Sequence, residues 1–587
     1  MGCRKEDGVP GRDTKVVHEG KAPKGVATPR REYRVPAARG EILGHVRIAD
    51  PFGALAKLGN QVLPSDMATR LSPDGIKKVI SEIENPVARA VGGHVDLARP
   101  FACAVIDPAV HELPLACVFG YTGGLGGLTK DLGPAAKLGS DGRLRAKTGS
   151  TELVFDALDD DVAVTGDATA FKSTEGYLRA LARPGGARDV EAVLHASHVA
   201  TQFRPQLTEL ALRLVREWGG EGVEADTITL GLDALEEVAT LAAYVERVEM
   251  HATVEPDGLV LGASVVPVAD ARLTRMLEAA PGLDPSLAEW APTGTMLLSV
   301  ERHRPEDELT GKLPAFVRRL AVAVPAAYLE QSTKQMLDGY EALQRKQAET
   351  YRPGSLLSVF HSPATPLGAV YVRPLKEGVF DGRDRWVQWS TEATPQALLG
   401  EELGRGLETL LTWSVRRDAM EVEGHPVDAW ELRLGDDTVR ALAADPRIGE
   451  LGQALMGKLE GGAPLLAVHR IEHEHEAAFV VAPLGPDAYV RKVIHARQGT
   501  GRMATTDLEA VLARHPKTRR LVAVSAFDIV RALHALLPAE AMAGVPDTVG
   551  RGLSDAFFVE AVSNDPHLVF EVVLSPSVLG AARLLPR

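Results

Sequence analysis

Two stretches of this chain, separated by 309 residues, share one pattern that limits the folds open to the sequence. In each stretch an apolar strand runs into a proline turn, and an amphipathic helix follows. The first stretch passes from Leu259 to Pro267 and the second from Leu568 to Pro576. A strand, turn and helix that recur at this distance predict two related halves, each with its own hydrophobic core.

A second pattern also occurs twice. A helical stripe ends at a pair of glycines, as helices commonly do, and two apolar strands and another helix follow. The first copy begins near residue 76 and has its glycine pair at 92–93, and the second begins near 448 and has its pair at 461–462. This agreement supports two halves, and it pairs the hairpin after residue 93 with the hairpin after residue 462.

Chain length and the kinds of element predict the architecture. A chain of 587 residues is too long for one core, so several domains are expected. Hairpins alternate with helices, which favours an α+β fold of antiparallel sheets with helices packed on one face. The predicted parts are a disordered basic tether at 1–43, an N-terminal half at 44–280, a turn-rich linker at 281–294 and a C-terminal half at 295–587.

Charge is spread unevenly along the chain. The formal net charge is −14, yet residues 1–40 hold ten basic and five acidic side chains. The acidic remainder lacks the basic face of a nucleic-acid-binding protein, so we expect no nucleic-acid partner. The basic segment has almost no apolar periodicity and cannot offset the entropy lost on ordering, so we expect disorder up to about Gly40. No apolar run in the sequence reaches the length of a transmembrane helix.

The first residues predict attachment to a membrane. Cys3 follows Gly2 and precedes the polar tether. A small residue, often glycine, stands before the lipidated cysteine of bacterial lipoproteins, and residues 2–3 with the tether resemble that class. The resemblance implies that Cys3 carries a lipid and that the folded part lies in the bacterial cell envelope, in the periplasm or at the outer membrane. The alternative is a cytoplasmic protein in which Cys3 has no such role.

The two remaining cysteines lie in apolar stretches on either side of residues 107–114. If that segment closes a hairpin centred on Val110, Cys103 and Cys117 face each other across two antiparallel strands. An oxidising periplasm would then permit a disulfide between them. The alternative is a pair of buried, reduced thiols that pack as small apolar side chains.

The sharpest chemical motif is H-x-x-E-H at residues 469–473, which resembles the signature of the inverzincin metallopeptidases. On a helix, His469 and His473 would share a zinc ion and Glu472 would polarise its bound water, with a later residue such as Glu540 as a third ligand. The flanking runs are typical of strands, however, and a strand separates Glu472 from the two histidines. We therefore expect no metal and no cofactor, and keep the peptidase as an alternative.

Three further motifs have structural explanations. The glycine-rich segment 120–127 joins a strand to a helix, where phosphate can bind, but it lacks the lysine of a P-loop. The acidic residues of segment 156–167 are not spaced as a calcium loop. A strand follows Ser554 where a nucleophile elbow needs a helix. We predict turns at all three positions and no catalytic residue.

These patterns predict a non-enzymatic, membrane-tethered protein of the bacterial cell envelope that acts as a binding or scaffold module. A second hypothesis is a carrier of lipid or another hydrophobic ligand, because curved antiparallel sheets backed by helices can enclose an apolar channel. A zinc metallopeptidase is the third. The expected partners are the membrane, through the lipid anchor, and a protein or a lipid.

Overall fold

The structure is a computed structural model, and it describes the following parts of the chain. The described segments are 33–37, 40–61, 94–148, 151–186, 188–202, 242–255, 258–269, 272–279, 282–302, 345–362, 365–379, 381–392, 401–408, 410–444, 463–482, 486–503, 519–536 and 556–576, with a few single residues between them. Cys3, Glu540 and Ser554 lie outside the described residues, so their predicted roles stay predictions.

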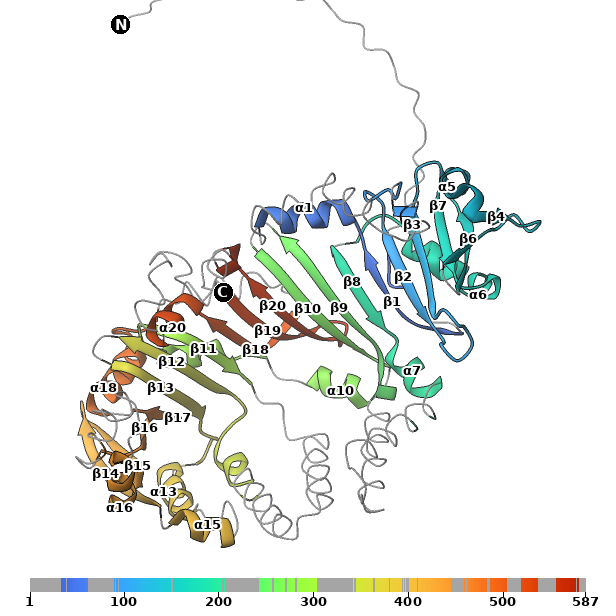
Figure 1. The fold of residues 1–587 in the computed structure, drawn as a ribbon. Coiled ribbons are helices and arrows are strands. Elements are labelled where there is room, and N and C mark those ends of the chain that lie inside the picture. The colour runs from blue at the N-terminus through green and yellow to red at the C-terminus, as the bar shows by residue number, and fades with distance from the viewer. Residues whose placement is uncertain are drawn as a thin grey trace, which may run out of the picture.

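One antiparallel sheet of twenty strands organises the protein and follows an arc (Figure 1). The first ten strands are β1 (Ile42–Ile48), β2 (Phe101–Ile106), β3 (Leu115–Gly120), β4 (Ala136–Leu138), β5 (Leu144–Thr148), β6 (Thr151–Leu158), β7 (Asp161–Thr165), β8 (Val190–Leu194), β9 (Val245–Glu255) and β10 (Gly258–Pro267). The second ten are β11 (Thr295–Glu301), β12 (Ser355–Ser362), β13 (Thr365–Pro374), β14 (Leu411–Val422), β15 (His425–Leu434), β16 (Leu466–His473), β17 (Glu476–Val481), β18 (Arg519–Phe527), β19 (Ala556–Ser563) and β20 (Leu568–Leu574). The fold is therefore α+β with an antiparallel sheet, as predicted.

The order of the first ten strands in the sheet is repeated by the second ten. The first ten lie in the order β4, β5, β6, β7, β3, β2, β1, β8, β9, β10. The second ten lie in the order β14, β15, β16, β17, β13, β12, β11, β18, β19, β20. Each strand thus has a counterpart ten numbers later. A register shift also recurs near the start of β1 and of β11, opposite β2 and β12.

The two sets of strands meet where β10 pairs with β20. The ladder sets Leu259 opposite Leu574 and Val265 opposite Leu568, with Gly262 opposite Glu571 at its middle. Leu568 lies 309 residues after Leu259, and Leu574 lies 309 residues after Val265. Each of these two pairs is therefore the equivalent of the other, and the ladder has a local two-fold arrangement. The spacing seen in the sequence is therefore the spacing of two strands that lie side by side in the structure.

Two expectations about the sheet are wrong. The sequence predicted several antiparallel sheets in two halves, but the β10–β20 ladder joins all the described strands into one sheet. The sequence also predicted that the hairpin after residue 93 and the hairpin after residue 462 are equivalent parts of the two halves. In the structure these hairpins are β2–β3 and β16–β17. The counterpart of β2–β3 by position in the sheet is β12–β13. A helix followed by a hairpin is a common local pattern, and only the long-range pairing distinguishes its copies.

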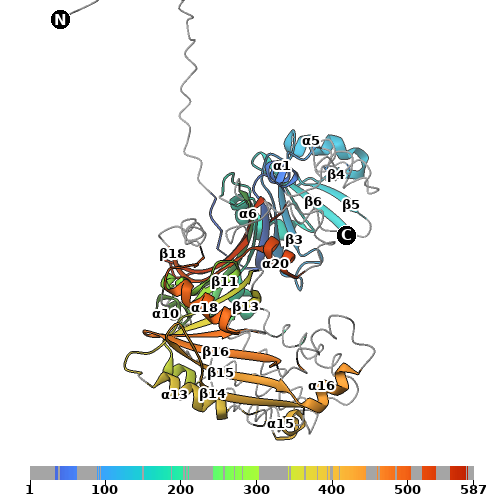
Figure 2. The same cartoon turned by 90° about the vertical axis from the view of Figure 1, so that its left-hand side faces the viewer.

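Helices lie on both faces of the sheet, which corrects the prediction of one covered face. The bounds of the described helices are α1 (Pro51–Gln61), α5 (Gly124–Leu132), α6 (Ala168–Leu181), α7 (Ala196–Gln202), α10 (Arg272–Ala279), α13 (Gly382–Glu392), α15 (Glu401–Glu408), α16 (Asp436–Ala443), α18 (Pro486–Arg497) and α20 (Ile529–Leu536), with short 3₁₀ helices η1 (Gly133–Ala135) and η2 (Pro285–Trp290). We call the face under α6 and α18 the core face, and the other the open face. On the open face, α5 and α13 pack near the two ends of the sheet and α10 near its middle. Figure 2 shows α13 and α15 beside β14.

The core face holds the two largest hydrophobic clusters. Around α6, buried residues from β1, β2, β3 and β7 pack against Phe171, Leu178 and Leu181 of the helix. Asp167 caps this helix by accepting hydrogen bonds from the first-turn amides, which fixes where the helix begins. Around α18, a larger cluster takes in β11–β13 and β16–β20, and the linker contributes Trp290 of η2. The predicted linker is thus packed into the core of the second half.

The folded part begins earlier than the predicted boundary at residue 43. β1 starts at Ile42, and Tyr33 already lies against the core face, where its ring stacks with the guanidinium of Arg47 at 3.9 Å. Tyr33 therefore belongs to the folded part, although its neighbours in sequence have the composition of a disordered segment.

A substitution of Gly44 tests how closely β1 and β8 approach each other. A Cβ atom at this position would lie 2.1 Å from the carbonyl oxygen of Val193, which is backbone and cannot rotate away. We expect Gly44→Ala to lower the free energy of unfolding by about 1–3 kcal/mol, because the two strands must separate to admit the methyl group. Chemical denaturation monitored by circular dichroism measures the change.

Gly176→Ala is the matched control. Gly176 lies inside α6, and no atom lies within 4 Å of the position its Cβ would take. The same added methyl group should therefore stabilise the protein by about 0.4–1 kcal/mol through helix propensity and chain entropy. A Gly44→Ala protein as stable as the parent would show that β1 and β8 are less closely packed than the structure has them.

Candidate functional site

An unbroken apolar surface covers the open face of seven neighbouring strands. The strands are β3, β2, β1, β8, β9, β10 and β20, and we call their open-face residues the apolar patch. Every member is apolar, glycine or cysteine; the members are Leu115, Cys117, Phe101, Cys103, Val105, Gly44, Val46, Ile48, Val190, Ala192, Leu194, Val248, Met250, Ala252, Val254, Leu259, Leu261, Ala263, Val265, Leu568, Phe570, Val572 and Leu574. Seven strands at the usual spacing span roughly 29 Å.

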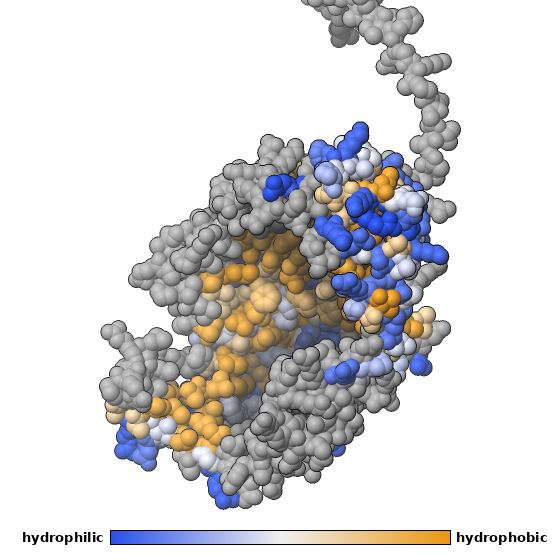
Figure 3. Space-filling view, turned by 45° about the vertical axis from the view of Figure 1, so that its right-hand side comes forward, coloured by the Kyte–Doolittle hydropathy of each residue, from blue (hydrophilic) through white to orange (hydrophobic). Residues whose placement is uncertain are grey.

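Much of this patch is exposed. Eight of its large side chains have 36–52% of their surface accessible: Val46, Phe101, Val105, Leu115, Leu194, Met250, Leu261 and Val572. Figure 3 shows apolar side chains gathered along a hollow in the molecule. Single exposed apolar side chains are normal on a soluble protein, but a contiguous patch of this extent is typical of a binding surface.

On three of these strands, β1, β8 and β9, the core face carries charged and polar side chains, which reverses the usual arrangement of a sheet. His45 and Arg47 on β1, Glu191 on β8 and Glu249 on β9 are each at most 7% exposed. Their counterparts in the second half include Leu298, Val300, Val524 and Phe557, all of which lie in the apolar cluster under α18. β1, β8 and β9 therefore bury charge and expose hydrocarbon.

Four buried side chains and the half-buried Tyr33 share a hydrogen-bonded network, which we call the polar cluster: Tyr33, His45, Tyr177, Glu191 and His195. The Tyr33 hydroxyl donates to Glu191 and lies 3.1 Å from Nε2 of His45. Nδ1 of His45 lies 2.7 Å from the Tyr177 hydroxyl, which in turn lies 2.9 Å from Nε2 of His195. A chain of this kind satisfies buried polar groups that would otherwise destabilise the fold.

The environment of the polar cluster shifts the pKa values of its members. Burial raises the pKa of Tyr177 and lowers the pKa of His195 to about 4, so that both are neutral at pH 7. Burial alone would raise the pKa of Glu191, but hydrogen bonds from His45 and Tyr33 and the charge of Arg188 hold it below its usual value. Glu191 is therefore the anionic member of the cluster.

Arg47 ties this region to the end of α6. Its guanidinium donates to the carbonyl oxygens of Leu181, Arg183 and Gly185 at 2.8–2.9 Å. A helix leaves its last carbonyl groups unpaired, and a cation placed there satisfies them and favours the helix dipole. The three hydrogen bonds that Nε and Nη2 of Arg47 donate thus serve the fold, and the same holds for the hydrogen bonds of the polar cluster.

The predicted cysteine hairpin is present as β2 and β3. The register sets Cys103 directly opposite Cys117, and the two sulfur atoms lie 2.17 Å apart. Both side chains project from the open face, next to Val46 in the apolar patch. The sequence placed the pair in a hairpin but gave no indication of the surface to which it belongs.

The H-x-x-E-H motif lies on β16, as the flanking runs indicated. His469 and His473 are four strand residues apart, roughly 13 Å, and two ligands of one zinc ion must both lie about 2 Å from it. Glu472 projects from the other face and forms an ion pair with Arg470 at 2.7 Å. The ring of His469 is buried between strands, and burial lowers its pKa. This geometry does not bring the three predicted zinc-site residues together.

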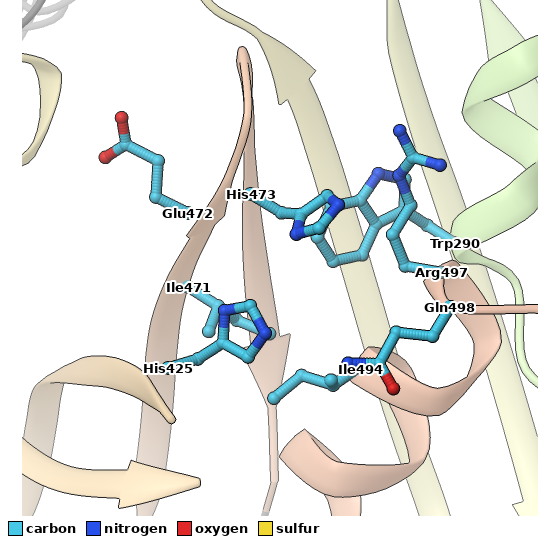
Figure 4. A pocket seen from close by; sticks show the side chains of 8 residues that line it. All are labelled: Trp290, His425, Ile471, Glu472, His473, Ile494, Arg497 and Gln498. Atoms are coloured by element: carbon cyan, nitrogen blue, oxygen red, sulfur yellow. The ribbon is translucent and has the colours of Figure 1, made fainter. Parts of the chain in front are cut away.

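Beside His473 lies a small pocket whose lining side chains Figure 4 displays. The rings of His425 and His473 are 5.7 Å apart between centroids, and Trp290 borders the same space. Its volume is about 10 Å³, which is room for roughly one water molecule. It is too small for an organic substrate.

The other two predicted turns that fall within the described residues are also structural. The glycine-rich segment joins β3 to α5, and Gly127 packs so closely that a Cβ would lie 2.4 Å from the carbonyl oxygen of Thr122. The acidic residues near β6 and β7 are dispersed, because Asp156 pairs with Arg143 and Asp161 with Arg99. In neither segment do three or more of the described acidic, histidine or cysteine side chains gather as ligands for a metal ion.

Within the described segments, no group of three or more His, Cys, Asp or Glu side chains is arranged to hold a metal ion. The helices that the structure describes also include none with the length and hydrophobicity needed to cross a membrane. No protein-family model matches the chain, and no curated protein or solved structure is detectably similar to it. The apolar patch is the feature whose composition points to a kind of ligand.

The buried His195 gives the fold a pH dependence. Its pKa is about 4 in the folded protein and about 6.5 when unperturbed, so between these values the unfolded chain binds a proton that the folded chain does not. Stability should fall as pH drops from about 6.5 toward 4, by up to roughly 3 kcal/mol from this group. We expect His195→Gln to flatten the decline in the unfolding midpoint measured between pH 7 and pH 5.

The comparison between variants isolates this effect. Burial also raises the pKa of Asp161 to about 6, which adds stability in acid and opposes His195 within the same range. The matched control is His94→Gln, which removes a histidine whose side chain is 54% exposed. If the two variants change the pH profile equally, His195 is not the group responsible.

Proposed function

We propose that the protein is a non-enzymatic, membrane-tethered binding protein of the bacterial cell envelope that takes the acyl chains of a lipid onto its apolar patch. The observation that carries this proposal is the composition of the patch, where seven adjacent strands present no polar side chain and eight large apolar side chains are exposed. Covering a few hundred Å² of such surface favours binding by several kcal/mol before the costs of association are subtracted.

The chemistry of the patch favours a lipid over a protein partner. Protein interfaces are only about 56–65% non-polar and carry roughly ten hydrogen bonds, which fix the orientation of the partner. The apolar patch has no side chain that could make such bonds, and its strand backbones are already paired with one another. A surface of this kind suits a flexible hydrocarbon chain, which needs no directional contacts. The hollow in Figure 3 gives such a chain a surface to follow.

We also propose that the two halves arose by duplication, that Cys103 and Cys117 form a disulfide and that Cys3 carries a lipid. The repeated strand order, the register shift common to β1 and β11 and the two-fold ladder of β10 with β20 support an origin of the two halves by duplication. The opposed sulfur atoms of Cys103 and Cys117 support a disulfide, which suits an oxidising envelope compartment. Lipidation of Cys3 would hold the patch close to a source of lipid.

Substitutions at the centre of the patch test the proposal. Met250→Glu and Leu261→Glu each place a carboxylate where a bound acyl chain would lie, and burying an unpaired charge is strongly unfavourable. We expect each to reduce the affinity for N-phenyl-1-naphthylamine, a neutral apolar fluorophore, by at least about tenfold. The parent protein should bind the dye and release it when a phospholipid is added.

Leu138→Glu is the matched control for both substitutions. Leu138 is 62% exposed on β4, outside the patch, so the change adds the same charge without touching the proposed site. Dye binding that is absent in the parent protein, or equal in all three variants, would contradict the proposal. Absence of dye binding is also the result expected if another segment of this chain covers the patch.

Attachment to the membrane has a separate test. In its native host the protein should fractionate with membranes, and Cys3→Ser should release it into the soluble fraction of the envelope. The matched control is the double variant Cys103→Ser and Cys117→Ser, which removes two thiols and leaves Cys3 in place. If Cys3→Ser protein remains fully membrane-associated, the lipid anchor is refuted, while the binding proposal stands on its own data.

A further inference from the structure

The apolar surface of the open face continues beyond the patch into the second half of the sheet. Pairs in register join one open-face residue from each of twelve neighbouring strands, from β14 to β9, into a single row that we call the apolar track. All twelve are apolar: Val415, Trp430, Val468, Val481, Ala369, Val359, Leu297, Phe527, Ala556, Leu574, Leu259 and Val254. The last three also belong to the patch, so the patch and the track form one surface.

The hydrophobic cores do not account for the track. Strands β11, β12 and β18 already present Leu298, Phe360 and Val524 to the cluster under α18. None of the twelve track residues belongs to a hydrophobic cluster that the structure describes. Ten of the twelve are half-buried, and their open-face neighbours Leu357 on β12 and Leu466 on β16 are 38% and 37% exposed. The open face of these strands is therefore apolar beyond what their core requires.

The track is longer than the binding of one lipid needs. Its strand spacings add up to roughly 53 Å, measured along the sheet. The hydrocarbon core of a bilayer holds two acyl chains end to end in roughly 30 Å, so one chain covers less than a third of the track. Figure 3 shows apolar side chains continuing along the hollow toward its lower end, the direction in which the strands of the second half lie in Figure 1. A row of this length suits the movement of a chain from one part of the sheet to another.

Resting on the proposed function, we propose that the track conducts acyl chains between the apolar patch and the end of the sheet at β14, so that the protein transfers lipid along its length. A polar side chain in the path would have to lose water before a hydrocarbon chain could pass, which costs free energy at that point. The unbroken row removes this cost on all twelve strands. On β18 and β11 the path is narrow: it passes over Phe527 and Leu297, and the adjoining open-face residues are Ser525 and Ser299, whose hydroxyls are 2.8 Å apart.

A charge in the narrow part of the track tests this inference. Transfer is measured from phosphatidylcholine vesicles that carry NBD-labelled and rhodamine-labelled phosphatidylethanolamine to unlabelled vesicles, as the rise in NBD fluorescence when the two labels separate. We expect the full-length protein to accelerate transfer and Leu297→Glu to lower the protein-dependent rate by at least about tenfold, because the carboxylate would have to lose water in the path of the chain. Leu297 lies three strand spacings from Leu574 at the edge of the patch, roughly 14 Å, so the affinity for N-phenyl-1-naphthylamine should change by less than about twofold.

Two further variants complete the comparison. Val359→Thr keeps the shape of the side chain and adds one hydroxyl to the track, so it should slow transfer several-fold. It takes the place of Leu297→Glu if circular dichroism shows that variant to be unfolded. Leu410→Glu is the matched control, because Leu410 is 46% exposed just before β14, outside the track, and the change adds the same charge. This control should transfer lipid at the rate of the parent protein.

The two proposals fail separately. A protein that only shuttles lipid on its patch would transfer it equally well with Leu297→Glu, so parent-like rates in the folded track variants would overturn the inference, as would an equal loss in Leu410→Glu. A parent protein that binds the dye but does not accelerate transfer would also overturn it. In each case dye binding and its loss in Met250→Glu would still support the proposed function. Absence of dye binding to the parent protein would overturn both proposals.

Discussion

The pairing of β10 with β20 is the interaction on which the rest of the structure depends. Among the described strands, this ladder alone joins the first ten strands to the second ten. Without it, each set would end in a strand of unpaired amides and carbonyls, which is a site for aggregation. Backbone hydrogen bonds set the register of the ladder, and the register in turn sets which side chains share a face. The continuity of the apolar patch from β10 onto β20 follows from that single alignment.

The sheet also explains how a polar core can be tolerated. Buried charges are stable only when hydrogen bonds and partners replace the water that they lose. In the first half Arg47 pairs with the carbonyl end of α6, and Glu191 accepts from Tyr33 and His45. The second half has an extensive apolar cluster under α18 at the equivalent places. The arrangement keeps the open face of β1, β8 and β9 out of the two clusters on the core face.

The sequence predicted the kinds of element well and their pairing poorly. Apolar alternation located β2, β3, β10, β16 and β20, and the spacing of 309 residues follows from the ladder between β10 and β20. Local pattern could not identify counterparts, because helix-and-hairpin segments resemble one another wherever they occur. The sequence did predict that the H-x-x-E-H motif lies on a strand, because the residues on either side of it are typical of strands. The strand in turn determines the distance between His469 and His473.

The candidate site could not be found in the same way, for a physical reason. Along β1, Val46 and Ile48 alternate with His45 and Arg47, and the rule that apolar residues face inward assigns the first pair to the core. The structure does the reverse, because Tyr177 and Glu191 satisfy the polar residues and are distant in sequence. The alternation was visible, but its direction depends on partners that only the fold assembles.

The exchange of apolar and polar faces on β1, β8 and β9 can be understood by comparison with the equivalent strands of the second half. β11, β18 and β19 follow the ordinary rule, with apolar side chains such as Val300 and Val524 inside and Ser299 and Glu560 on the open face. β1, β8 and β9 occupy the same places in their own half and break the rule. Had both halves broken it, the protein would have lacked the cluster under α18. One half of each kind gives a sheet that keeps this cluster and still presents hydrocarbon on the open face of β1, β8 and β9, which is the property that an apolar ligand requires.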